Sequence, residues 1–202
     1  MGNGTEHRRN FLGLFSLWAL LASAGIVAIV GGALAAPDRP AATSGVTTRI
    51  GQGNADVTAL AMAADASTFA FASAASDLLA GDTNNLSDIF IFDRSSGQTN
   101  RASVSDDGAE ANGVSYTPAL SADGRYVVFS SDATNLVLDD TNGRRDIFVR
   151  DLVSGRTTRI SVDSAGAQSN GDSFNPHISA GGRYVAFESD ATNLVGGDTN
   201  GR

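Results

Sequence analysis

The strongest polar constellation in the sequence is a short acidic loop that recurs along the chain. In its middle copy the loop carries oxygen-bearing side chains at Asp140, Asn142 and Asp146, with a glycine at position 143. The other copies repeat this pattern at offsets of 58 residues and supply Asp82, Asn84, Asp88, Asp198 and Asn200. Calcium takes about six to eight oxygen ligands, and closely spaced Asp and Asn side chains around a sharp turn can provide them. These eight residues are therefore candidate calcium ligands.

The same residues also fit a turn with no metal. The complete calcium loop has an acidic residue two positions before Asp140, where this sequence has Leu138, and the third copy has Gly196 there. Asp and Asn side chains often bond to their own backbone and hold a turn ahead of the next strand. Both interpretations stay open at this stage, and no cofactor other than calcium is expected.

Few residues remain for catalysis. The chain contains no cysteine, which excludes disulfides and thiol nucleophiles, and its two histidines are His7 and His177. His177 stands where the preceding copy has Ala119, so it is unique among the copies. The sequence also lacks the G-x-S-x-G nucleophile elbow. We therefore predict a protein that is not an enzyme and has no catalytic residues.

Charge excludes one class of partner. The formal net charge is −8, and arginine is the only basic residue type apart from histidine. Contacts to phosphates need clustered basic side chains, and outside the N-terminus the sequence has no basic cluster. Nucleic acid is therefore not an expected partner.

The candidate loops belong to a longer repeat of 58 residues. Ser121–Val137 reads SADGRYVVFSSDATNLV, and Ser179–Val195 reads SAGGRYVAFESDATNLV. Over residues 117–144 and 175–202, 20 of 28 positions are identical. A more divergent copy precedes them, and we divide the repeats into residues 59–116, 117–174 and a partial copy at 175–202.

Each copy has the signals of four short strands separated by turn residues. In the middle copy we expect strands at Pro118–Ser121, Tyr126–Ser131, Asp146–Leu152 and Thr157–Val162. Such a unit has two apolar faces and cannot bury both alone, so the copies must stack. The predicted fold is all-β, with about three β-propeller blades of four antiparallel strands in an incomplete ring. A two-sheet sandwich is the rival, but it does not require near-identical copies.

Residues 47–58 are predicted to hold an orphan outer strand ahead of the first blade. Thr47–Ile50 matches Thr157–Ile160, which we place in the outer strand of the middle copy. A propeller uses such a strand when its first strand completes its last blade. A decayed earlier repeat would leave the same trace.

The N-terminus has the pattern of an export signal. Residues 1–10 are polar and include Arg8 and Arg9, and residues 11–36 form an uncharged apolar run that ends in Ala-Leu-Ala-Ala. The arginine pair followed by Asn-Phe-Leu resembles the twin-arginine signal. We expect residues 1–36 to form an apolar helix that is either a cleaved signal peptide or an uncleaved membrane anchor, with residues 37–46 as a linker. Both alternatives export the remainder to the periplasm, the cell surface or the medium, and the membrane is contacted only through residues 11–36 if they are not removed.

The repeat itself resembles a known family. The pattern S-x-D-G-R-Y-V-x-F-x-S, followed by D-I-F-V-R-D and a Ser-Gly turn, resembles the TolB-type, WD-like β-propeller repeat of bacterial envelope proteins from Thr47 to Arg202. The resemblance implies propellers that commonly have six blades and act in binding. Because the third copy stops before its D-I-F strand, we expect a fragment of a longer protein, or further blades supplied by oligomerisation.

These observations predict an exported, non-enzymatic binding or scaffold module for a protein, peptide or glycan. The alternative is an accessory propeller domain of a larger, peptidase-like secreted hydrolase whose catalytic part lies outside this chain. Arg125 and Arg183, which follow the glycine of the D-G-R or G-G-R turn, are expected to pair with carboxylates of an adjacent blade.

Overall fold

A computed structural model describes residues 27–30, 47–50 and 53–199 of the chain. Every regular element in these residues is a β-strand, which confirms the all-β prediction. Four residues of the apolar N-terminal segment form strand β1 (Val27–Val30), which pairs antiparallel with β2 (Thr47–Ile50). The other residues of the predicted N-terminal helix and the linker at 37–46 lie outside the described residues. The described part of the chain contains no helix of the length and apolar character needed to cross a membrane.

The first blade is a sheet of four antiparallel strands in sequence order. Its strands are β3 (Val57–Met62), β4 (Thr68–Ser73), β5 (Asp88–Asp93) and β6 (Gln98–Arg101). Each strand pairs with the next along the chain, so β3 and β6 form the two edges.

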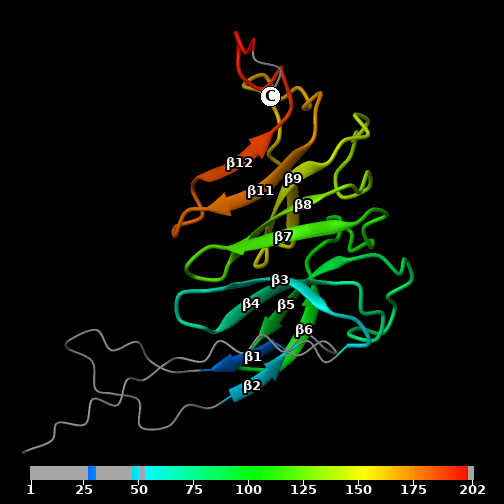
Figure 1. Ribbon diagram of the computed structural model, residues 1–202, viewed down its shortest axis with the longest axis vertical. Coiled ribbons are helices and arrows are strands. Elements are labelled where there is room, and N and C mark those ends of the chain that lie inside the picture. Colours follow the sequence, from blue (N-terminus) through cyan, green and yellow to red (C-terminus); the bar gives the residue numbers. More distant parts are fainter. Residues whose placement is uncertain (1–26, 31–46, 51–52, 200–202) are drawn as a thin grey trace, which may run out of the picture.

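The second blade repeats this arrangement, and the third begins it. The second contains β7 (Ser115–Leu120), β8 (Tyr126–Ser131), β9 (Asp146–Asp151) and β10 (Arg156–Arg159). The third has β11 (Ser173–Ile178) paired with β12 (Val185–Ser189). The three sheets follow one another along the long axis of the molecule, with β1 and β2 beside the first (Figure 1).

The two central strands of each complete blade are buried because both of their faces are covered. In β4, Ala70 and Ala72 pack in one cluster with Val127 and Phe129 of the second blade. The alternate residues Phe69 and Phe71 point to the opposite side of the sheet, where they pack with Ile50 of β2 and with Phe90 and Phe92 of β5. Burying one such phenylalanine stabilises the fold by about 1.5–3 kcal/mol. Successive residues of a strand point to opposite faces, and here both faces are apolar. The sheets therefore have to stack on both sides to bury them.

Strand ends differ from the sequence prediction by more than one residue at two places. Strand β7 begins at Ser115, three residues before the predicted Pro118, so the repeat boundary at 116/117 falls inside it. Strand β10 ends at Arg159 rather than Val162, because Val162 leaves the sheet and bridges Gln168 instead. The corresponding bridge in the preceding copy joins Val104 to Glu110. These two hairpins between blades were missed in the sequence.

Consecutive blades meet through the turns between their first two strands. The Ala64 N–H donates to the Ala122 carbonyl and the Ala122 N–H donates to the Ala180 carbonyl, both at 2.9 Å. At the same junctions Gly124 lies against Thr68, and Gly182 lies against the ring of Tyr126. A Cβ atom at Gly182 would come within 2.5 Å of that ring, so only glycine fits without rearrangement.

We expect Gly182→Ala to destabilise the protein more than Gly166→Ala. Both glycines have positive φ, at 71° and 87°, and both substitutions carry a backbone strain of about 1–2 kcal/mol. Only Gly182 faces a neighbouring side chain, whereas a Cβ atom at Gly166 meets open space, and overpacking adds about 1–3 kcal/mol. Urea unfolding of both variants measures the difference, and equal losses of unfolding free energy would contradict the proposed contact between blades.

Candidate functional site

The predicted acidic residues of the first blade surround an arginine. Asp82 lies in the connection between β4 and β5, Asp88 begins β5, and Arg101 ends β6. The Arg101 guanidinium lies 3.3 Å from an oxygen of each aspartate through Nη2 and Nε, and its Nη1 contacts the carboxylate of Glu110. The side chains of Asp82 and Asp88 are 1% and 0% exposed. The group therefore combines three carboxylates with one buried guanidinium.

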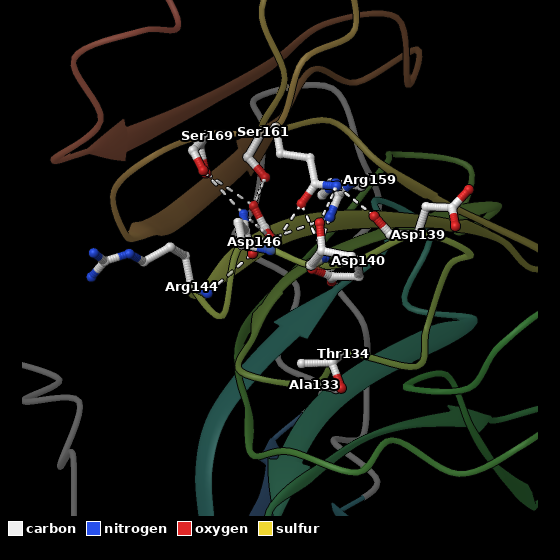
Figure 2. Close-up of polar contacts among 12 residues, drawn as sticks. Ala133, Thr134, Asp139, Asp140, Arg144, Asp146, Arg159, Ser161 and Ser169 are labelled. Carbon is white, nitrogen blue, oxygen red and sulfur yellow. Dashed lines mark hydrogen bonds and ion pairs between the residues drawn. The ribbon is translucent and has the colours of Figure 1, made fainter.

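The second blade has the same group with one charge fewer. Arg159 Nη1 lies 2.9 Å from Asp140 Oδ1 and 3.6 Å from Asp146 Oδ2 (Figure 2). Gln168 takes the place of Glu110, and its Oε1 accepts hydrogen bonds from the N–H groups of Thr141 and Asn142. With two carboxylates and one guanidinium, this cluster carries a formal charge of −1, against −2 in the first blade.

Asp146 joins several segments of its blade. Its Oδ1 accepts hydrogen bonds from Ser161 Oγ at 2.5 Å and Ser169 Oγ at 3.1 Å, and its Oδ2 accepts one from Asn142 Nδ2 at 2.9 Å. Figure 2 shows Ser161 and Ser169 converging on this carboxylate. A buried carboxylate needs such partners, since a charge buried without them is costly. Asp146 therefore holds β9, the end of β10 and the connection to the next blade at one point.

The asparagines of the motif act as turn residues in both blades. Asn84 Oδ1 accepts the Leu86 N–H at 2.6 Å, and Asn142 Oδ1 accepts the Arg144 N–H at 3.1 Å. Their amide groups donate toward Asp88 and Asp146. This is the side-chain bond expected of a turn that precedes a strand. The asparagine oxygen is thus turned toward its own backbone.

Three carboxylates of the first blade lie close enough together to share a metal ion, and they are not the three ligands predicted for this copy. Ligand oxygens of Asp82, Asp88 and Glu110 all lie within 4.8 Å of one another. Glu110 comes from the hairpin between the blades, and no motif in the sequence marked it. Of the third copy, Asp198 is described and Asn200 lies outside the described residues. Calcium binding stays a prediction.

We expect calcium to leave the thermal stability unchanged. In both complete blades an arginine already places a positive charge among the carboxylates that would bind the ion. Melting temperatures are to be compared after dialysis against a chelator and after addition of millimolar calcium. An increase with calcium that Glu110→Gln abolishes would instead establish a metal site in the first blade.

Burial makes protonation of these carboxylates easier. Burial raises the pKa of Asp88 to about 6. The hydrogen bond from Ser103 and the positive charge of Arg101 lower this pKa, but they offset the effect of burial only in part. Burial likewise raises the pKa of Asp82 and of Asp140. An unfolded aspartate has a pKa near 3.9, so the folded protein binds more protons than the unfolded chain between about pH 4 and pH 7.

We therefore expect the free energy of unfolding to rise as the pH falls from 7 to 5. A pKa of about 6 for Asp88 gives a gain of about 1 kcal/mol over this interval, because the folded state takes up a proton that the unfolded state does not. In Asp88→Asn this part of the pH dependence should disappear, although the lost hydrogen bond lowers stability at every pH. An unchanged slope in urea titrations of this variant would reject the assignment.

An open groove of about 690 Å³ lies at the outer rim of the second blade. It runs between the hairpin after β6, the connection after β8, and strand β10, and its lining includes Asp106, Leu138 and Arg156. Two hydrogen bonds connect the hairpin to strand β10. The Thr157 N–H donates to Asp106 Oδ1 at 2.6 Å, and the Thr157 hydroxyl donates to the Val104 carbonyl at 2.7 Å. The walls of the groove are therefore held in place by hydrogen bonds.

The remaining predicted polar residues lie away from the clusters. His177 is exposed in β11, opposite Ala186, and within the described chain no hydrogen bond or ion pair links it to a serine or a carboxylate. Arg125 pairs with Asp151 at 2.7 Å inside its own blade, so the expected pairing with an adjacent blade is wrong. The reason is the antiparallel ladder, which places the start of β8 opposite the end of β9. Arg183 packs over the ring of Tyr184.

Sheets of four sequential antiparallel strands that stack face to face are the blades of a β-propeller. No family model and no curated protein matches the chain. Among solved structures it is similar to TolB from Acinetobacter baumannii, with 19% identity and a TM-score of 0.44 over 71% of this chain and 29% of that one. It is also similar to a putative TolB from Agrobacterium tumefaciens, with 23% identity and a TM-score of 0.46 over 73% of this chain and 43% of that one. The similarity to the tricorn protease has 13% identity and a TM-score of 0.49 over 73% of this chain and 12% of that one. The chain thus spans less than half the length of each of these proteins.

Proposed function

We propose that this protein is an exported, non-enzymatic binding module built on β-propeller blades. The observation that supports this proposal best is a contrast between the polar groups of the blade framework and the side chains of the rim groove. The acidic and serine side chains of the blade framework bond to one another, as Asp146 does with Ser161 and Ser169. The rim groove, in contrast, presents an exposed leucine and an exposed arginine to solvent. Recognition by a rigid scaffold is typically carried by such loop-borne surfaces.

Export is supported by the N-terminal sequence. Two arginines precede 26 uncharged residues, and small residues end this run. The absence of cysteine is compatible with any compartment, so the proposal depends on the signal pattern alone. A periplasmic, cell-surface or secreted location follows from it.

The groove favours a protein or peptide partner over a glycan. None of the residues that line it is aromatic, and its exposed surface is mainly apolar with a few charged groups. Glycans usually stack on aromatic rings, whereas extended peptides place apolar side chains against leucine and valine and pair their backbone with strand edges. Nucleic acid is disfavoured by the net charge of −8.

Site-specific photo-cross-linking in the exporting cell tests the proposal. A photoreactive amino acid is placed at Leu138 in the groove, at Leu60 on the exposed side of β3, and at Val153, an exposed control in the turn after β9. We expect a discrete adduct of constant mass from position 138 or 60 that excess unlabelled protein competes away. Adducts that are equally diffuse at all three positions would contradict a binding function.

A further inference from the structure

The rim groove runs along an edge of β10 with which no strand of the described residues pairs. Strand β10 is the outer edge of its sheet, and the Ile160 N–H donates to the Ile147 carbonyl just beyond it. Because backbone groups of an antiparallel strand alternate in direction, those of Thr157 and Arg159 point away from β9. The Thr157 N–H is already taken by Asp106. The Thr157 carbonyl and the main chain of Arg159 face the groove side of the edge.

Two side chains in this groove depart from the repeat. Leu138 is 92% exposed, whereas the other copies have Ala80 and Gly196 at the same position. Arg156 is exposed, and the first blade has Gln98 there. Neither change serves the packing of the blade, because both side chains lie in solvent. Both add to the groove what an extended ligand would contact, an apolar surface and a positive charge.

Arg156 forms no ion pair with the two carboxylates that line the groove. Of the two carboxylates in the lining, Asp106 accepts the Thr157 N–H and Asp107 accepts a hydrogen bond from Ser105 Oγ. The other arginine of the lining, Arg159, is paired with Asp140. Among the described residues no ion pair involves Arg156. The Arg156 guanidinium is therefore available to pair with an acidic group of a ligand, in a lining that also contains the carboxylates of Asp106 and Asp107.

We propose that the groove binds an extended peptide segment that carries an apolar side chain and an acidic residue on the same side. The apolar side chain packs on Leu138, the acidic group pairs with Arg156, and the peptide backbone bonds to the free edge of β10. The volume of about 690 Å³ suits a segment of a few residues, as in other pockets for small ligands. This inference rests on the proposed binding function and names the chemistry of the partner.

Fluorescence anisotropy with designed peptides tests the inference on the full chain. The probe is a labelled pentapeptide, Thr-Leu-Thr-Glu-Thr, in which leucine and glutamate share one side of an extended strand. We expect saturable binding, weakened about fivefold or more when lysine replaces the glutamate, since one ion pair becomes a repulsion. Methylation of the central backbone nitrogen should weaken it further if the peptide pairs with the strand edge.

Three variants assign the contacts. Arg156→Gln and Leu138→Ala introduce residues that the first blade carries at the same positions, so both should fold with unchanged melting temperature. Arg156→Gln is expected to remove the preference for glutamate over lysine. Leu138→Ala should weaken both peptides about tenfold by the loss of buried apolar area. Leu60→Ala, on the inner strand of the first blade, should leave binding unchanged.

The inference is overturned if the probe shows no saturable binding, or if Arg156→Gln and Leu138→Ala bind both peptides as the wild type does. These outcomes are separable from failure of the proposed function. A competed cross-link at position 60 alone would keep the binding module and reject the groove. A cross-link at position 138 combined with indifference to the charge of the peptide would keep the groove and reject its acidic ligand.

Discussion

The fold depends on one buried carboxylate in each complete blade, Asp88 and Asp146. Each side chain is fully buried, and an aspartate in that setting must be paired or it destabilises the folded state. The partners of Asp146 come from the acidic loop, from β10, from Ser161 two residues beyond β10, and from the connection to the next blade. Satisfying one charge thus fixes the relative position of four segments, and apolar stacking then buries the faces of the sheets that these segments define.

This constraint explains how the framework and the surface can vary separately. Asp140, Asp146 and Arg159 contact one another and segments of their own repeat, so a change at Leu138 or Arg156 breaks none of these contacts. Leu138 and Arg156 differ from their counterparts in other copies, while Asp140, Asp146 and Arg159 keep theirs. A repeat can therefore acquire a specific surface on one blade without loss of the fold.

The sequence was sufficient for the strands and insufficient for the clusters. The strand at Tyr126–Ser131 was predicted with its exact ends because residues apolar on both faces, between turn residues, leave one assignment. Arg101 and Glu110 could not be connected to Asp82 in advance, because they are 19 and 28 residues away and belong to no motif. The groove was equally hidden, since the hairpin that forms one wall has only the single bridge between Val104 and Glu110.

The hairpin also explains why the groove belongs to the second blade. Eleven positions separate Arg101 from Asn112, and likewise Arg159 from Asn170, but only five separate Arg49 from Asn54 at the start of the first blade. The shorter connection lacks the residues that form the hairpin. Among the residues that the structure describes, none makes with β6 the contact that Asp106 makes with Thr157 in β10. A connection longer by six residues, together with Leu138 and Arg156, thus distinguishes the edge of β10 from the edge of β6.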